Sequence, residues 1–122
     1  MKLHLTQQAG QNLFTAYGAG YVMVNQQRFE TSLIVLPDKL INDWPPRSLD
    51  DLTEVHFAYL AALDAEIVLL GTGNMLRFPH PRLSSPLTQA RIGFEVMDTF
   101  AAARTYNILM GEGRRVAAAL LL

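Results

Sequence analysis

The sequence contains no cysteine. Disulfide bonds, a catalytic thiolate and cysteine-ligated zinc or iron–sulfur clusters are therefore excluded for this chain, which fits a reducing compartment. Long hydrophobic runs are also missing. The longest, residues 116–122, is far shorter than the roughly 20 residues that a membrane-spanning helix needs, and the first residues lack the apolar core of a signal peptide. We therefore expect a cytosolic protein with no direct membrane insertion.

The chain has no excess of charge of either sign. Ten basic residues face 11 acidic ones, which gives a net charge of −1. Nucleic-acid-binding domains usually carry a strongly basic surface, so we expect no nucleic-acid partner. Hydrophobic residues make up 50% of the 122 residues, and we find no internal repeat or linker. These features predict one domain over residues 1–122 with a well-covered core.

No complete catalytic or cofactor-binding motif is found. Gly71 and Gly73 follow a predicted strand, but Leu76 stands where a dinucleotide fingerprint has its third glycine. The three histidines share no metal-ligand spacing, and no serine lies in the G-x-S-x-G turn of a hydrolase nucleophile. We expect no cofactor and no metal ion. The sequence favours a protein without enzymatic activity and leaves the question open.

The second half of the chain alternates strands and short helices. Asp98 is placed to cap a helix that Gly111 ends, and Ser84 and Ser85 precede Pro86 as the capped start of another. The order predicts a parallel sheet with right-handed connections. The unbroken apolar run 116–121 predicts a central strand that is covered on both faces. The expected elements are strands over 66–71, 93–97 and 114–121, and helices over 86–91 and 99–110.

The first half predicts an antiparallel hairpin. Strands over 21–24 and 29–36 flank a polar turn at 25–27, and the hairpin either extends the parallel sheet or packs beside it. Residues 1–19 are weakly patterned. A crossing loop over 40–48 leads to a helix over 52–63 that starts near Asp51 or Thr53. Its expected apolar face consists of Leu52, Val55, Tyr59, Leu60 and Leu63. We therefore predict an α/β fold with a mixed sheet.

A crevice beyond the parallel strands is the first candidate site, because ligands of open α/β sheets bind at the carboxyl ends of the strands. The intervening loop adds Arg77, which either pairs with Asp98 or binds an anion near a helix N-terminus. A purely structural ion pair that pins the loop is the alternative. The candidate binding residues are Gly71, Thr72, Gly73, Arg77, Asp98 and Thr99.

One face of the helix over 99–110 is the second candidate. Phe100, Arg104 and Asn107 lie together at helical spacing, beside a core stripe formed by Ala102, Tyr106, Leu109 and Met110. A polar stripe with one phenylalanine is either a solvated face or a surface for a protein partner, since arginine and phenylalanine are enriched in interfaces.

Three segments carry a family resemblance: RFETSLIVLPDKLINDW, EIVLLGTGNMLRFPHP and IGFEVMDTFAAARTYNILMGEGRRVAAALL. They resemble a family of small, uncharacterised α/β proteins that includes the mitochondrial complex I assembly factor 3. The resemblance spans residues 17–121 and is most specific over 95–120. The family motif positions that match are Gly71, Gly73, Arg77, Pro79, Glu95, Asp98, Thr99, Ala102, Arg104, Thr105, Asn107 and Gly113.

The resemblance implies a three-layer fold whose central sheet is mixed and mostly parallel. It also implies a non-catalytic, assembly-type protein that works beside protein partners, while the bacterial and archaeal members have no assigned activity. Ala103 stands where many bacterial relatives carry cysteine, so a thiol-based role is excluded here. A mitochondrial targeting segment is not visible, so we expect a bacterial, cytosolic protein. The oligomeric state is not predicted.

Overall fold

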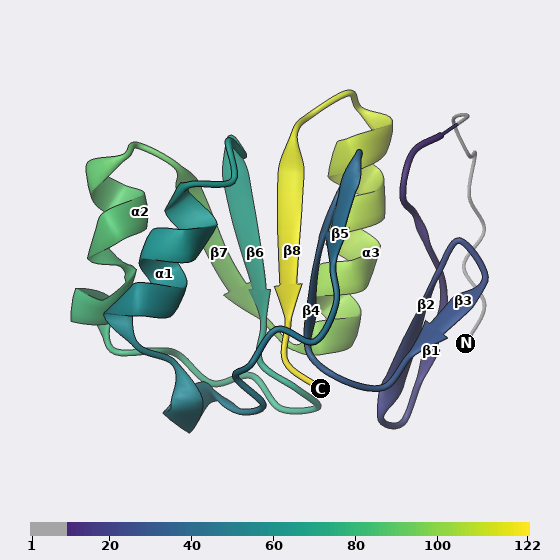
Figure 1. Cartoon of the computed structure of the whole chain (residues 1–122), viewed down its shortest axis with the longest axis horizontal. Helices are drawn as coiled ribbons and strands as arrows, with labels where there is room; N and C mark the ends of the chain where they lie inside the picture. The colour runs from purple at the N-terminus through teal and green to yellow at the C-terminus, as the bar shows by residue number, and fades with distance from the viewer. Residues whose placement is uncertain (1–9) are drawn as a thin grey trace.

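Two sheets and three α-helices make up residues 10–122, the part of the chain that the computed structural model describes (Figure 1). The small sheet contains β1 (Phe14–Gly18), β2 (Tyr21–Val24) and β3 (Gln27–Phe29). The large sheet contains β4 (Leu33–Leu36), β5 (Lys39–Ile41), β6 (Ile67–Gly71), β7 (Gly93–Met97) and β8 (Val116–Leu120). The helices are α1 (Glu54–Ala61), α2 (Ser85–Gln89) and α3 (Thr99–Gly111), with short 3₁₀ helices η1 (Leu49–Asp51) and η2 (Pro81–Ser84).

The large sheet is mixed, as the sequence predicted. Its strand order is β5-β4-β8-β6-β7. Strand β6 pairs in parallel with both β7 and β8, whereas β4 pairs antiparallel with β5 and β8. The carboxyl ends of β6, β7 and β8 therefore meet at one edge, the lower edge in Figure 1. The α/β fold class is confirmed.

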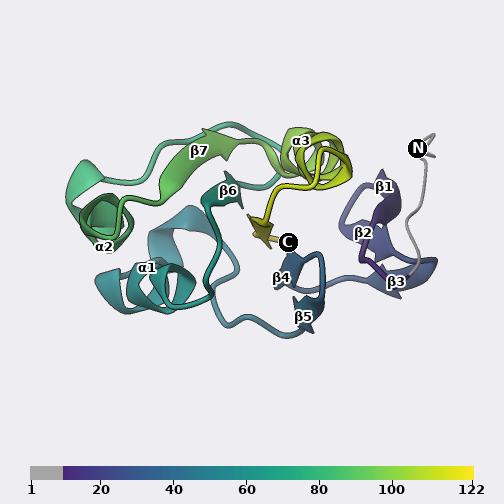
Figure 2. The same ribbon diagram turned by 90° about the horizontal axis from the view of Figure 1, so that it is seen from above.

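Successive side chains of each strand point to opposite faces of the large sheet, so the hydrophobic core is divided into two clusters, one on each face. On β6, Leu69 faces α3 and the small sheet, while Val68 and Leu70 face α1 and α2. Residues of β4 and β8 alternate in the same way, as expected for strands buried on both sides. Figure 2 shows the resulting layers, with α1 and α2 on one side of the sheet and α3 with the small sheet on the other.

Strand β8 lies in the middle of the large sheet, between β4 and β6. All five of its residues are fully buried. The prediction of a central strand covered on both faces is confirmed. Its run of three alanines, residues 117–119, divides between the two core clusters, so even these small side chains contribute to both faces.

The predicted hairpin forms, but its second strand is divided between the two sheets. Strand β3 pairs with β2, and Phe29 lies opposite Val22 in the small sheet. The chain then leaves at 30–32, and β4 enters the large sheet beside β8. A two-residue turn at Asn25 and Gln26, both with positive φ, allows β3 to begin at Gln27. The sequence left open whether the hairpin extends the large sheet or packs beside it. The β2–β3 hairpin belongs to the separate small sheet, so it packs beside the large one.

Two strands were missed in the first half of the chain. Strand β1 forms the edge of the small sheet and buries Phe14 and Tyr17, although its pattern is interrupted by a register shift between Phe14 and Ala16. Strand β5 lies in the stretch expected to be a loop, because a tight turn at 37–38 folds it back onto β4. Both are edge strands. Residues 1–9 lie outside the described part of the chain.

Helix α1 is shorter than predicted, and its apolar face differs. Thr53 is extended and serves as the N-cap, with the His56 ring accepting its backbone N–H at 3.0 Å. Leu52 therefore precedes the helix and does not share its period. Phe57 and Leu60 point inward, whereas Val55 and Tyr59, expected in the core, are 75% and 43% exposed.

The ends of the other helices also depart from expectation. The Ser84 hydroxyl donates to the carbonyl of Pro81 within η2 instead of capping α2, which runs from 85 to 89. Helix α3 includes Gly111, its last residue, and is followed by the C-cap Glu112 and by Gly113, whose φ is +82°. The N–H groups of Gly113 and Arg114 bond the carbonyls of Met110 and Leu109, a Schellman motif in which the left-handed residue favours glycine.

Candidate functional site

The floor of the predicted crevice is a close contact between the end of β6 and the start of α3. A Cβ atom on Gly71 would lie 2.8 Å from the Cα of Thr99, so only glycine fits there. The N–H of Thr99 donates to the carbonyl of Gly73, and the Thr99 hydroxyl accepts the N–H of Gly73, both at 2.8 Å. The same hydroxyl donates to the carbonyl of Leu121. These residues tie three chain segments together.

Asp98 caps α3, as predicted from the sequence. Its carboxylate accepts the backbone N–H of Ala101 at 2.9 Å, and its own backbone is extended. This satisfies one of the N–H groups that a helix start leaves unpaired and places a negative charge at the positive end of the helix dipole. Asp98 does not contact Arg77 in the described structure. The Arg77–Asp98 alternative is therefore wrong.

Arg77 pairs with a residue that sequence analysis did not consider. Its guanidinium lies 3.1 Å from the carboxylate of Asp50 in η1, and both side chains are at least half exposed. The partner is 27 residues away in a segment expected to lead into a helix, so no local pattern pointed to it. Arg77 thus forms a structural ion pair that holds the loop, with Asp50 as its acid. Binding of an anion by Arg77 stays a prediction.

The loop that carries Arg77 is fastened by Thr72. The Thr72 hydroxyl donates to the carbonyl of Met75 at 2.7 Å and accepts the N–H of Arg77 at 3.2 Å. The Thr72 backbone N–H also bonds the carbonyl of Met97 at the end of β7. Thr72 is buried, so these bonds give the loop a fixed internal support.

A pocket of about 490 Å³ opens beside this loop, at the carboxyl edge of the large sheet. Thr72, Gly73, Arg77 and Thr99 line it, as predicted, but Gly71 and Asp98 do not. Gly71 is buried in the sheet, and the Asp98 carboxylate is turned to its helix. Other walls come from the β1–β2 turn, from Phe100 and from Arg47 with its neighbours in the segment before η1.

Arg47 is the main site residue that sequence reasoning missed. It lies in the stretch 40–48, which showed only a proline-rich loop, and it reaches the pocket because that loop crosses below the large sheet (Figure 1). Asp51 accepts the backbone N–H of Arg47 rather than its side chain. No ion pair joins the Arg47 guanidinium to an acidic residue within 10–122.

The face of α3 considered as a partner surface contacts the small sheet. The ring of Phe100 stacks on Tyr17 with centroids 4.7 Å apart, and the guanidinium of Arg104 lies over the same ring and donates to its hydroxyl. Asn107 is buried, and its amide accepts the N–H of Phe14 at 3.0 Å and donates to its carbonyl at 2.8 Å. Asn107 is thus unavailable to an outside partner, because it docks β1 onto the helix.

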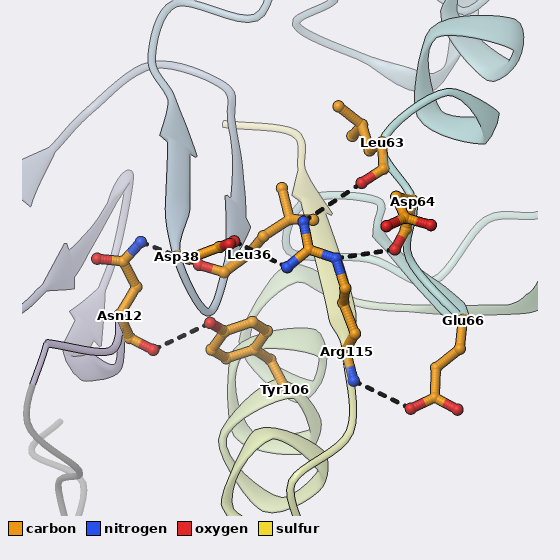
Figure 3. Close-up of polar contacts among 8 residues, drawn as sticks. All are labelled: Asn12, Leu36, Asp38, Leu63, Asp64, Glu66, Tyr106 and Arg115. Carbon is orange, nitrogen blue, oxygen red and sulfur yellow. Dashed lines mark hydrogen bonds and ion pairs between the residues drawn. The ribbon is translucent and has the colours of Figure 1, made fainter.

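At the opposite edge of the large sheet, Arg115 links several turns (Figure 3). Its guanidinium donates to the carbonyl of Asp64 and the carboxylate of Asp38, both at 2.8 Å, and its backbone N–H bonds Glu66. The hydrogen bond from Arg115 holds the pKa of Asp38 below its usual value. This cluster joins the β4–β5 turn to the start of β8 and lies away from the pocket.

Tyr106 belongs to the same edge but is buried under the small sheet. Its hydroxyl donates to the carbonyl of Asn12 at 2.9 Å (Figure 3). Burial raises the pKa of the Tyr106 phenol well above its ordinary value, and the nearby charge of Asp38 raises it further. The ring packs edge-on against Phe14 at 5.2 Å, so Tyr106 is a structural link between α3 and β1.

No three histidine, aspartate or glutamate side chains within residues 10–122 gather as a metal site would require. The rings of His56 and His80 instead accept backbone N–H groups at helix starts, and His4 lies outside the described residues. Within the same range, no helix combines the length and the apolar character needed to cross a membrane.

Comparison with known proteins places the chain in a family. The family model for a protein of unknown function, DUF498/DUF598, matches residues 14–121. The chain belongs to this family. A relative in Mus musculus, named NADH dehydrogenase [ubiquinone] 1 alpha subcomplex assembly factor 3, is 38% identical over 90 residues, which are 72% of this chain and 48% of that protein. The chain thus spans about half the length of this relative, and the resemblance predicted from the sequence is confirmed.

Solved structures of similar proteins agree with the fold. A crystal structure of a Bordetella parapertussis protein superposes with a TM-score of 0.87 at 43% identity, covering 94% of this chain and 98% of that one. A solution structure from Bordetella pertussis, described as an Mth938-like domain, gives a TM-score of 0.80 at 39% identity, covering 99% and 92%. Neither description assigns a reaction.

Proposed function

We propose that this chain is a non-enzymatic, assembly-type protein that binds other proteins in the cytoplasm of a bacterium. The observation that carries the proposal is its relationship to proteins named as complex I assembly factors, one of them 38% identical over 72% of the chain. Since the chain spans about half of that relative, its own partners need not be the same. Solved relatives from two Bordetella species support a bacterial setting.

The chemistry of the site supports a role without catalysis. The hydroxyls of Thr72 and Thr99 are engaged in bonds that hold the backbone, and Asp98 caps α3. Arg77 is paired with Asp50. The candidate residues that could act as acids, bases or nucleophiles therefore have structural roles. A general acid or base must instead be positioned to exchange a proton with a substrate, so these contacts favour a role without catalysis.

Affinity capture from the native cell tests the proposal. The tagged full chain, expressed at its natural level, is isolated and its co-purifying proteins are quantified against a tag-only control. We expect a small set of enriched proteins, with respiratory-complex subunits or their assembly factors among them. Recovery of no protein above the control would contradict the assembly role. Cell fractionation tests the location, and recovery outside the cytoplasmic fraction would contradict it.

A second candidate function is favoured by the pocket itself. Arg47 and Arg77 line one cavity of about 490 Å³, which suits a small molecule or anion, as a binding protein or an enzyme would hold. Thermal unfolding of the chain with phosphate or citrate at constant ionic strength tests this candidate. A rise in Tm that the Arg47→Gln variant abolishes would support it. An unchanged Tm at millimolar anion concentrations would argue against it.

A further inference from the structure

We infer that the loop 74–78 and the adjoining pocket form a docking surface for a protein segment in which an acidic side chain lies beside apolar ones. This inference rests on the proposed protein-binding function and names the surface and the chemistry of the partner. The acidic side chain enters the pocket toward Arg47 and Arg77. The apolar side chains pack on Met75, Leu76 and Phe78.

The apolar half of the surface is concentrated in one short stretch. Six large hydrophobic side chains are exposed within residues 10–122, and three of them lie within residues 75–78. Met75 is 68% exposed, Leu76 51% and Phe78 71%. Single exposed hydrophobic residues are ordinary on a protein surface, but a cluster beside a pocket marks an interaction site.

The backbone of the loop is fixed even though its side chains are exposed. Thr72 bonds both the carbonyl of Met75 and the N–H of Arg77, and Thr99 holds Gly73 from the other side. The Arg77–Asp50 pair adds a lateral tie to η1. The loop is therefore preorganised to present its apolar side chains, which reduces the ordering entropy lost when a partner binds.

The charges near the pocket favour a carboxylate. The stretch 74–82 contains Arg77 and Arg82 and no acidic residue. Arg47 lines the same pocket as Arg77. The acids next to lining residues are engaged. Asp50 pairs with Arg77, and Asp51 accepts the backbone N–H groups of 47 and 48. The Asp98 carboxylate accepts the N–H of Ala101 as the cap of α3. An arginine that lacks an acidic partner beside a pocket is suited to a charge-assisted bond with a carboxylate.

The shape of the site favours a protein segment over a lipid surface. Exposed apolar side chains with neighbouring arginines also suit a membrane interface, but a flat bilayer contacts a convex rim. Here Arg47 and Arg77 line a concavity of about 490 Å³, which a side chain of a peptide can fill. Interfaces of this kind typically place a buried anchor in such a pocket and surround it with complementary contacts.

Selection from a displayed library of random 12-residue peptides tests the inference with a defined probe. The full chain is the target, and the best peptides are resynthesised and titrated by fluorescence anisotropy. We expect sequences with Asp or Glu next to Leu, Met or Phe. Their Kd should rise about 10-fold or more for Phe78→Ser and for Arg47→Glu, and Arg47→Lys should retain most of the affinity.

Ile108→Ser is the matched control, since Ile108 is 62% exposed on α3 and does not line the pocket. Its Kd should equal that of the unaltered chain, and circular dichroism verifies the fold of each variant. Selected peptides without acidic residues, or equal binding by Phe78→Ser and Ile108→Ser, would overturn the inference while leaving the assembly role intact. Phe78-dependent sedimentation with phosphatidylglycerol vesicles, without peptide selection, would overturn it in favour of a membrane surface.

Discussion

Thr99 and Gly73 bond each other reciprocally across the carboxyl edge of the large sheet. The N–H of Thr99 donates to the carbonyl of Gly73, and the N–H of Gly73 donates to the Thr99 hydroxyl, each at 2.8 Å. Because the hydroxyl also reaches Leu121, one small side chain joins the β6 loop, the start of α3 and the segment after β8. The geometry of the pocket depends on this junction.

Replacing Thr99 by valine keeps the shape of the side chain and removes its hydroxyl. Thr99 is only 1% exposed, so the N–H of Gly73 and the carbonyl of Leu121 would lose a buried partner. We expect a loss of roughly 2–4 kcal/mol in the free energy of unfolding, measured by urea denaturation. Thr99→Ser retains the hydroxyl and should be the milder change. If the valine variant were as stable as the serine variant, the hydrogen bonds of the Thr99 hydroxyl would not stabilise the fold.

Asp98 and Arg77 should act independently. Capping predicts that Asp98→Ala lowers the free energy of unfolding by about 1 kcal/mol and that Asp98→Asn lowers it much less, since asparagine also caps. Because Arg77 pairs with Asp50 instead, the effects of Asp98→Ala and Arg77→Ala should add in a double-mutant cycle. A coupling energy near the size of the single effects would mean that the two side chains interact after all.

Asn107 should hold the small sheet on α3. In Asn107→Ala the buried N–H and carbonyl of Phe14 lose their side-chain partners, which should lower the free energy of unfolding by roughly 2–4 kcal/mol. Amide hydrogen exchange should then become faster in β1–β3 while β6 and β8 stay protected. Ile108→Ala, an exposed change on the same helix, is the control. Uniform loss of protection in both sheets would contradict a local docking role.

Tyr106 should make the fold sensitive to alkaline pH. Its pKa is raised in the folded chain, mainly by burial, so the unfolded chain releases the phenol proton at lower pH than the folded one. Stability is therefore complete below the ordinary tyrosine pKa of about 10 and falls as pH rises above it. Circular dichroism from pH 9 upward should show this decline, and Tyr106→Phe should reduce its slope. Identical slopes would contradict the assignment.

The sequence predicted the parallel part of the large sheet better than the rest. Residues 67–70 and 116–121 form unbroken apolar runs because both faces of β6 and β8 are covered. Strands β1 and β5 were missed because they lie at sheet edges, where only part of a strand is buried. In addition, the register shift between Phe14 and Ala16 interrupts the pattern of β1, and β5 has only three residues. The prediction that Val55 and Tyr59 lie on the buried face of α1 was wrong. That face was assigned by counting helical steps from Leu52, but α1 begins after its N-cap Thr53, so Leu52 is not part of the helix.

The sequence predicted those parts of the candidate site that depend on residues close together in the chain. Asp98 follows a strand and precedes a helix, so its capping role could be read directly from the sequence. Asp50 reaches Arg77 only through the tertiary fold, across 27 residues of chain. Arg47 likewise joins Arg77 in the lining of the pocket only through the tertiary fold, and nothing in the local sequence around either residue signals this. The burial of Asn107 likewise depends on β1, which is 93 residues away.

Site-specific photo-crosslinking in the native cell tests the central claim most directly. A benzophenone amino acid replaces Phe78 in one strain and Ile108 in another, two exposed positions of which only Phe78 lies in the loop 74–78. After irradiation, the account predicts a discrete crosslinked protein from position 78 that is absent from position 108 and weakened by Arg47→Glu. No adduct at position 78, or the same adducts at both positions, would contradict the claim that this loop binds a partner.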